Sequence, residues 1–385
     1  MIAKENYEKQ HIMELHKSSK KDPQLLERAL HAFGLLEAIS RVGLPFIFKG
    51  GTCLMLLLKH PMRLSTDIDI IVAPGTPIEK YLEEAAKIFP FREQEEQVRI
   101  GKNKIEKRHF KFTYESPVTG KDIYILLDIL FEESHYEGVI EKEIKNELLL
   151  LEGEPLKVKI PSINCILGDK LTAFAPHTTG ILLDTGKDME VMKQMYDVCT
   201  LLEEFDDYQE MYKTYRRIAE QEIAYRGKTD TIDDVLKDTF RAAYCIASRG
   251  KVSAEEYPLY VKAIRSLRSH IYAENYSPEI AAVRAVKIMY ITACMLNGMP
   301  FEKIEDSSLY ENEKYIGDEL KHLKYLRKIN LEAYAYSIKT DRIMRIGKER
   351  DKMHDAIMAG KEQVDKSELI DGAEVLQKMR DKYGL

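Results

Sequence analysis

The spacing of apolar and polar residues changes twice along the chain, which predicts three successive segments. In the first, residues 1–42, apolar residues recur at helical spacing from Leu25 to Ile39. Asp22-Pro23 stands just before this run, and an acidic capping residue followed by proline at the first helical position is a typical helix start. The sequence therefore predicts an N-terminal helical segment.

Residues 43–162 have the pattern of short strands instead. β-like runs separated by turn signals such as Pro74-Gly75, with one helical stretch among them, predict a small mixed sheet with helices on it. The predicted strands are Phe46–Lys49, Asp67–Ala73, His109–Tyr114 and Ile123–Phe131, and the predicted helix is Ile78–Ile88.

From residue 163 onward the pattern is almost wholly helical, and the charged tail after Lys339 predicts a solvated pair of helices. The predicted helices include Ile163–Phe174, Lys187–Phe205, Ile232–Ser248, Tyr257–His270, Pro278–Leu296 and Glu313–Ile338. The predicted fold class is therefore α+β: a core of residues 43–162 with a small mixed sheet, followed by a large all-helical C-terminal domain of residues 163–385.

Composition narrows the possible functions. The chain has 385 residues, of which 44% are hydrophobic and 32% charged, as in a folded protein with a substantial core. A formal net charge of -6 gives no general attraction for nucleic acid. The five scattered cysteines form no CxxC pair and are expected to be buried and reduced. Without an apolar run of signal-peptide or membrane-spanning length, we expect a cytoplasmic protein with no membrane partner.

The most informative segment begins with a turn, Gly50-Gly51-Thr52, between the predicted strand ending at Lys49 and an apolar helix. Two glycines allow a sharp turn and the close approach of a ligand, and the free N–H groups of a helix start favour an anion. The Thr52 hydroxyl would add a donor. These residues are candidates for binding a phosphate, and an ordinary strand–helix turn is the alternative.

Asp67 and Asp69 begin the next predicted strand. Because side chains alternate along a strand, both carboxylates project from the same face. Neighbouring carboxylates repel each other unless they are well solvated or share a cation, and their oxygens suit Mg²⁺ or Mn²⁺. A solvated strand edge is the alternative. Together with the glycine turn, this pair would place a triphosphate and its metal on one side of the sheet.

Asp128 is the only charged residue in the apolar run Ile123–Phe131. An unpaired charge is costly to bury, so Asp128 needs either a metal ion or a structural partner such as a buried arginine. As a third carboxylate on a neighbouring strand, it would complete a two-metal site. Such a site lowers the pKa of an attacking hydroxyl and stabilises a leaving pyrophosphate.

These motifs, Lys-Gly-Gly-Thr at 49–52 and Arg-x-Ser-x-Asp-x-Asp at 63–69, resemble those of the polymerase-β-like nucleotidyltransferase superfamily. More narrowly, the chain resembles the AbiEii/AbiGii family, the toxins of type IV toxin–antitoxin and phage abortive-infection systems, which includes the MenT toxins. The resemblance implies a polymerase-β-like core. It also places Arg63 and Ser65 in the active site, with Ser65 helping to hold a phosphate.

The family pattern continues with an aspartate on a strand, a lysine in the next domain's first helix and an aspartate in the following helix, which Asp128, Lys170 and Asp197 match in order. Lys170 falls on an apolar stripe, where an inward lysine needs an anion such as an NTP phosphate; snorkelling past the core edge is the alternative. Asp197 would pair with Lys170, orient the acceptor hydroxyl, or form only a helix-to-helix salt bridge. The family's basic residues before this aspartate are reduced here to Lys193.

The resemblance implies a metal-dependent enzyme that moves an NMP from an NTP onto an acceptor hydroxyl. The implied acceptor is the 3′ end of tRNA, and the implied protein partner is a cognate antitoxin. Two alternatives stay open: nucleotidylation of a protein or small molecule, which the acidic charge favours, and a non-catalytic NTP-binding interaction protein. Two basic clusters would serve an RNA acceptor, or else form solvated faces. They are Lys102, Lys104, Lys107, Arg108 and Lys111, and Arg342, Arg345, Lys348, Arg350 and Lys352.

Overall fold

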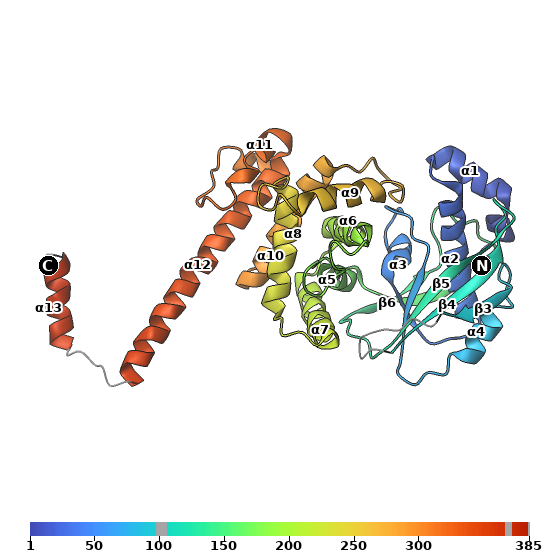
Figure 1. Ribbon diagram of the computed structural model, residues 1–385, viewed down its shortest axis with the longest axis horizontal. Coiled ribbons are helices and arrows are strands. Elements are labelled where there is room, and N and C mark those ends of the chain that lie inside the picture. Colours follow the sequence, from blue (N-terminus) through green and yellow to red (C-terminus); the bar gives the residue numbers. More distant parts are fainter. Residues whose placement is uncertain (98–105, 366–371, 384–385) are drawn as a thin grey trace.

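The β-like runs form a five-stranded mixed sheet in the computed structural model, which describes residues 1–97, 106–365 and 372–383 (Figure 1). The strand order is β1-β2-β5-β4-β3; β2 and β5 run parallel, and the other neighbours are antiparallel. A separate hairpin, β6–β7, follows. The strands are β1 (Ile47–Lys49), β2 (Ile68–Val72), β3 (Glu93–Glu96), β4 (Lys107–Glu115), β5 (Asp122–Phe131), β6 (Val139–Glu143) and β7 (Lys157–Pro161).

The sheet has one apolar face and one face that carries polar residues. Ile70 on β2 lies beside Ile129 on β5, and both are buried. Asp69 and Asp128, one position earlier on the same strands, stand on the opposite face. α2 (Pro23–Arg41) contacts β2, β5 and α4 (Glu79–Ala85), and its apolar residues belong to the same core as Ile70 and Ile129. The opposite face, which carries Asp69 and Asp128, is therefore the face of the candidate site.

The predicted N-terminal helix is α2, which follows η1 (Lys4–Tyr7) and α1 (Lys9–Ser19). The Asp22 side chain accepts a hydrogen bond from the Leu25 amide at 3.0 Å, and Pro23 occupies the first turn. The predicted helix start is thus confirmed. α2 ends at Arg41, and Ser162 caps the start of α5. The predicted boundaries at residues 42 and 162 therefore coincide with the end of one helix and the start of another. The division into separate domains stays a prediction.

The remainder of the chain is a bundle of helices around α10, which contacts α6, α8 and α12 and is buried over most of its length. The helices of this part are α5 (Ile163–Ala173), α6 (Asp188–Glu204), α7 (Tyr208–Arg226), α8 (Ile232–Ala247), α9 (Tyr257–Leu267), α10 (Pro278–Asn297), α11 (Leu326–Ile329), α12 (Leu331–Asp365) and α13 (Gly372–Tyr383), with η2 (Ser307–Tyr310) and η3 (Lys321–Leu323). α3 (Gly50–Leu57) lies between β1 and β2 in the chain and contacts both strands. The predicted α+β class is confirmed.

One predicted helix, Glu313–Ile338, is wrong. Residues 313–330 form turns and short helical pieces, and the long helix begins at Leu331. Asn330 has an extended backbone, and its side chain accepts a hydrogen bond from the Ala333 amide at 2.8 Å. This cap starts a new helix. α7, β3 and the β6–β7 hairpin were not among the predicted elements. β3 and β6 are mostly exposed, so they lack the alternation that marks a half-buried strand.

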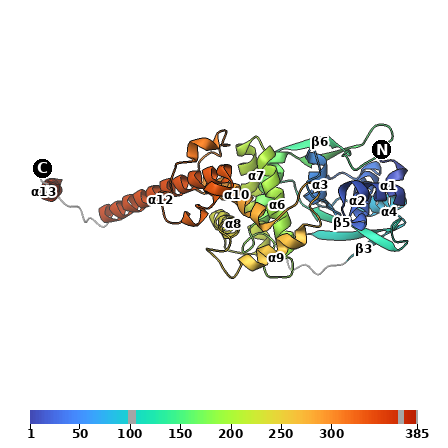
Figure 2. The same ribbon diagram turned by 90° about the horizontal axis from the view of Figure 1, so that it is seen from above.

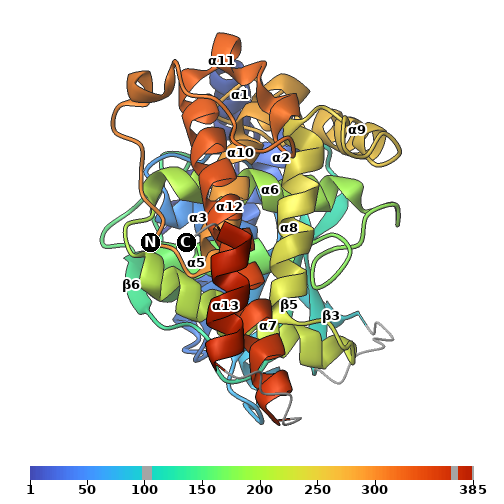
Figure 3. The same cartoon turned by 90° about the vertical axis from the view of Figure 1, so that its left-hand side faces the viewer.

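α12 extends well beyond the bundle, and α13 lies past its far end (Figures 1 and 2). Figure 3 looks along this projection, and the first part of α12 contacts α10, α11 (Leu326–Ile329) and η2 (Ser307–Tyr310). The charged tail thus forms two helices, as predicted; α12 is buried against the bundle as far as Ile343 and is mostly exposed from Arg345 onward. Within the described ranges, no helix is both long enough and apolar enough to cross a bilayer.

Replacing Asp22 by alanine tests the helix cap. The variant loses the acceptor for the Leu25 amide, and we expect the free energy of unfolding to fall by about 0.5–2 kcal/mol. Chemical denaturation followed by circular dichroism measures the change. Asp22→Ser retains a capping oxygen and serves as the matched control. An equal loss in both variants would contradict the assignment to the cap.

Candidate active site

Three aspartates lie close together around the start of β2. Asp69 on β2 is directly beside Asp128 on β5 in the parallel register, so both carboxylates stand on the same face. Asp67 precedes β2 by one position. The structure therefore brings together on neighbouring strands the three residues that the sequence singled out as carboxylate ligands.

The crowding of these carboxylates changes their acidity. Burial, followed by the negative charges of Asp128 and Asp67, raises the pKa of Asp69 to about 7. Burial also raises the pKa of Asp67, although the nearby Arg28 opposes this shift. A carboxylate that resists ionisation beside two others is in the electrostatic situation that a divalent cation relieves. The donor set therefore fits the predicted Mg²⁺ or Mn²⁺.

The side chains are not arranged as a finished metal site. Within the described part of the chain, no group of three or more His, Cys, Asp or Glu side chains is placed so as to hold a metal ion. His109 Nδ1 lies 2.6 Å from an Asp128 oxygen, and Arg28 Nη2 lies 3.8 Å from an Asp67 oxygen. Exposed side chains change rotamer quickly, and both carboxylates are partly exposed. Their role as metal ligands stays a prediction.

The glycine turn contacts the aspartates directly. Gly50 has a φ of +81°, in the left-handed region that favours glycine, and a Cβ there would lie 1.9 Å from Asp69 Oδ2. A Cβ on Gly51 would lie 2.6 Å from Arg63 Nη2 and 2.7 Å from Ser65 Oγ. The start of α3 is therefore in contact with Asp69 and Ser65, at the place where the sequence predicts a phosphate.

The buried Thr52 side chain connects α3 with the segment that contains Asp67. Its fully buried hydroxyl donates a hydrogen bond to the carbonyl oxygen of Asp67 at 2.6 Å. The hydroxyl thus fixes the aspartate segment to α3, which is a role that the sequence did not reveal. The predicted contact of Thr52 with a phosphate stays a prediction.

A buried ion cluster joins the loop before β2 to the helical bundle. Arg63 Nε and Nη2 each donate a hydrogen bond to Asp197 at 2.7 Å, and Lys170 Nζ lies 3.0 Å from Asp197 Oδ2. Although burial favours the neutral acid, the charges of Arg63 and Lys170 hold the pKa of Asp197 below its usual range. The pairing of Asp197 with Lys170 is thus observed. A contact of Lys170 or Arg63 with NTP stays a prediction, since both cations are engaged here.

Two further contacts of the site were missed in the sequence. Lys49 Nζ lies 3.0 Å from Asp169, which also accepts a hydrogen bond from the Tyr136 hydroxyl at 2.7 Å. His109 lies opposite Asp128 in the antiparallel β4–β5 pair. Asp169 is a charged residue next to Lys170 within an apolar helix, so the sequence pattern could have identified it. The partner of Asp128 depends on strand register, which the sequence does not specify.

The predicted basic clusters are largely neutralised by neighbouring acids. Arg108 forms salt bridges with Glu79 at 2.6 Å and with Glu96 at 2.8 Å. In the C-terminal cluster the ion pairs are Arg342–Glu313, Arg345–Glu349, Lys348–Glu319 and Arg350–Asp351. Lys102 and Lys104 lie outside the described residues. The C-terminal cluster therefore has the solvated, paired character that the sequence left open.

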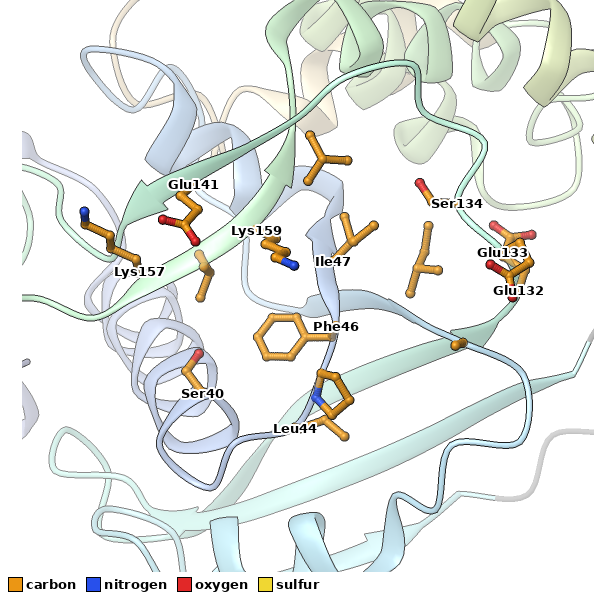
Figure 4. Close-up of a pocket in the computed structure, with 15 residues that line it drawn as sticks. Ser40, Leu44, Phe46, Ile47, Glu132, Glu133, Ser134, Glu141, Lys157 and Lys159 are labelled. Carbon is orange, nitrogen blue, oxygen red and sulfur yellow. The ribbon is translucent and has the colours of Figure 1, made fainter.

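A groove of about 570 Å³ lies between β1 and the β6–β7 hairpin, and it contains none of the predicted site residues (Figure 4). Figure 4 shows Lys157 and Glu141 at one side, with Glu132 and Glu133 at the other. The groove is thus separate from the three aspartates.

The Gly50 turn packs against Asp69, which stands beside Asp128 on the neighbouring parallel strand, and this is the arrangement in which the sequence predicts a phosphate and its metal. The family model described as "Nucleotidyl transferase AbiEii toxin, Type IV TA system" matches residues 34–281, more than half of the chain. The chain therefore belongs to the AbiEii nucleotidyltransferase family, and the predicted recognition and enzyme class are confirmed. No curated protein sequence matches the chain.

Solved structures give only distant likenesses. The JHP933 protein of Helicobacter pylori has 14% identity and a TM-score of 0.39, covering 71% of this chain and 94% of its own. An antigenic nucleotidyltransferase-like protein from Paracoccidioides brasiliensis has 16% identity and a TM-score of 0.33, covering 53% of this chain and 94% of its own.

Gly50→Ala should disable the site, because the new Cβ displaces the Asp69 carboxylate. Gly43→Ala is a matched control: Gly43 has a φ of +79°, and a Cβ there meets nothing within 4 Å. Both variants should lose about 1–2 kcal/mol of stability from left-handed strain. Mn²⁺ binding, followed by electron paramagnetic resonance, should fall only in Gly50→Ala. Equal Mn²⁺ binding in the two variants would show that Asp69 is not a ligand.

The raised pKa of Asp69 predicts a pH-dependent stability difference between wild type and Asp69→Asn in the absence of metal. An unfolded aspartate has a pKa of about 4, whereas Asp69 titrates at about 7 in the fold. The folded wild type thus binds more protons between these values, and its stability falls as pH rises through them. Asp69→Asn lacks this loss of stability. Its free energy of unfolding should therefore match that of the wild type near pH 4 and exceed it above pH 7.

Thermal melting across this pH range measures the difference. Addition of Mg²⁺ at pH 8 should stabilise wild type and leave Asp69→Asn unchanged, because bound cation stabilises the folded state in proportion to its affinity. A pH-independent difference between the two proteins would mean that Asp69 titrates as an ordinary carboxylate.

Proposed function

We propose that the chain transfers an NMP from an NTP to an acceptor hydroxyl and releases pyrophosphate, with Mg²⁺ or Mn²⁺ held by Asp67, Asp69 and Asp128. The observation that carries this proposal is the register that sets Asp69 beside Asp128, against the Gly50 turn. When bound there, the metal would supply charge for the triphosphate and lower the pKa of the attacking hydroxyl.

The protein groups have distinct tasks in this proposal. The backbone of the Gly50 turn and the Ser65 hydroxyl contact the triphosphate. Asp128 accepts the proton of the acceptor hydroxyl as its oxygen bonds to the α-phosphorus and the bond to pyrophosphate breaks. His109, 2.6 Å from Asp128, orients that carboxylate. Catalysis on this scheme is mainly positioning and charge neutralisation.

The acceptor that we propose is the 3′ end of tRNA, and the biological role is that of the toxin in a toxin–antitoxin pair, with a cognate antitoxin as partner. Membership of a toxin family supports the role. Lys107 and Lys111 support the acceptor, because they alternate with His109 on β4 and so share the face of Asp128. Modification of the tRNA end would block aminoacylation and stop growth.

A protein or small-molecule acceptor is the second candidate. It is favoured by the net charge of -6 and by the acids paired with Arg108, Arg342 and Lys348. These features weaken any broad electrostatic attraction for RNA.

The first experiment is incubation of the protein with total tRNA, Mg²⁺ and each of the four α-labelled NTPs, beside Asp69→Asn. We expect label in tRNA with wild type, and a rate at least about a hundredfold lower in the variant, because metal stabilisation of transition-state charge amounts to several kcal/mol. Gly43→Ala, which keeps the aspartates intact, controls for general destabilisation.

A parallel incubation with cell lysate protein distinguishes the acceptors. Label in protein and none in tRNA would replace the tRNA proposal by the second candidate. Undiminished transfer by Asp69→Asn would overturn the metal scheme itself.

A further inference from the structure

Arg28 is a charged residue that the proposed mechanism does not use, although it reaches the acidic centre. It lies on α2, in the N-terminal segment outside the family match of residues 34–281. Its Nη2 is 3.8 Å from Asp67 Oδ1, which is too long for a hydrogen bond. Its Nε is buried and has no hydrogen-bond partner among the described residues. The guanidinium is therefore close to the candidate metal ligands without being hydrogen-bonded to Asp67.

The position of Arg28 is fixed by the helix that carries it. Leu26, Ala29 and Leu30, on either side of Arg28 in α2, are fully buried in the core of the sheet. The Arg28 side chain itself is 39% exposed. A rigid helix thus presents a partly exposed guanidinium to the start of β2. A preorganised donor fork of this kind suits a phosphate group.

Two residues of the helical bundle approach the same place. Lys193 on α6 is hydrogen-bonded to Glu190 at 2.8 Å, and its charge acts on Asp67 together with that of Arg28. His270 follows α9, and its carbonyl oxygen accepts a hydrogen bond from the Leu64 amide at 2.7 Å. Arg28 and Lys193 therefore bring positive charge to Asp67 from two separate elements, and burial followed by the charge of Lys193 lowers the pKa of His270 to about 4, which places the His270 side chain near the same cations.

The other cations near the aspartates are already engaged. Lys170 and Arg63 share Asp197, and Lys49 is paired with Asp169. An NTP carries more negative charge than one metal ion neutralises, so its triphosphate needs further cationic partners. Among the described residues, the one ion pair of Arg28 is its 3.8 Å contact with Asp67, so its partly exposed guanidinium is open to a phosphate.

We propose that Arg28 binds the triphosphate of the NTP, so that the N-terminal segment forms one wall of the nucleotide site. This inference rests on the proposed function, in which the acceptor hydroxyl lies at Asp128 and the triphosphate lies at the Gly50 turn and Ser65, and it adds that the triphosphate extends toward Asp67. Arg28 is then on the nucleotide side, with Lys193 and His270 closing that side from the bundle.

The test measures nucleotide binding without turnover. Isothermal titration calorimetry with the α,β-methylene analogue of each NTP, in Mg²⁺ and without acceptor, gives the Kd for the full chain. We expect Arg28→Gln to raise the Kd roughly tenfold or more, because it removes a charge-assisted hydrogen bond. Arg28→Lys keeps the charge but loses the forked guanidinium, so its Kd should lie between those of the wild type and Arg28→Gln. Arg41→Gln, at the exposed end of the same helix, is the matched control.

Mn²⁺ affinity, measured without nucleotide, separates a phosphate contact from damage to the acidic centre. Removing a positive charge beside Asp67 should leave Mn²⁺ binding as tight or tighter. A weaker analogue Kd with intact Mn²⁺ binding supports the proposal. Weaker Mn²⁺ binding in Arg28→Gln overturns it, because the effect then arises from a disturbed site.

Two other outcomes overturn the proposal. In the first, Arg28→Gln is folded and binds the analogue with an unchanged Kd, and only its melting temperature is lower. Arg28 would then be a structural counter-charge for Asp67. The other is an unchanged analogue Kd with a raised KM for the acceptor. If wild type binds no analogue at all, the proposed function itself fails, and this result is distinct from a defect confined to the variant.

Discussion

The buried carboxylate of Asp197 is the constraint on which the site depends. It lies on α6 and is held by Lys170 from α5 and by Arg63 from the loop before β2. Removing one partner from such a cluster leaves an uncompensated buried charge and costs about 3–5 kcal/mol. The cluster therefore fixes the helical bundle to the loop that leads into Asp67, and the Leu64–His270 backbone hydrogen bond reinforces this link.

A fixed loop explains how the fold tolerates three crowded aspartates. The register between β2 and β5 forces Asp69 against Asp128, and the Gly50 turn closes on Asp69 from the other side. Burial, and after it this repulsion, raises the pKa of Asp69. Strained or repulsive arrangements persist only where the surrounding structure determines them, and they are typical of functional sites. The surrounding core thus offsets an unfavourable arrangement that a cation would relieve.

The sequence predicted the parts of the site that local rules control. Strand alternation placed Asp67 and Asp69 together, an isolated charge in an apolar run marked Asp128, and the Asp22 cap located α2. It could not predict Thr52 bonding to the Asp67 carbonyl, His109 opposite Asp128, or the Lys49–Asp169 pair. These contacts depend on register and on the packing of distant elements, which a local pattern does not encode. The late start of α12 was missed for a related reason, since the cap at Asn330 outweighs the apolar periodicity before it.

Charge pairing also limits how an RNA acceptor would be recognised. Among the described residues of the two basic clusters, Arg108, Arg342, Arg345 and Lys348 face acids at salt-bridge distance, and the chain as a whole is acidic. Each phosphate that a protein neutralises adds about one unit to the salt dependence of binding. Lys107 and Lys111 share the face of Asp128, and an RNA bound there would be held at its end. Recognition of a short single-stranded end fits the proposed chemistry at a terminal hydroxyl better than recognition of a duplex would.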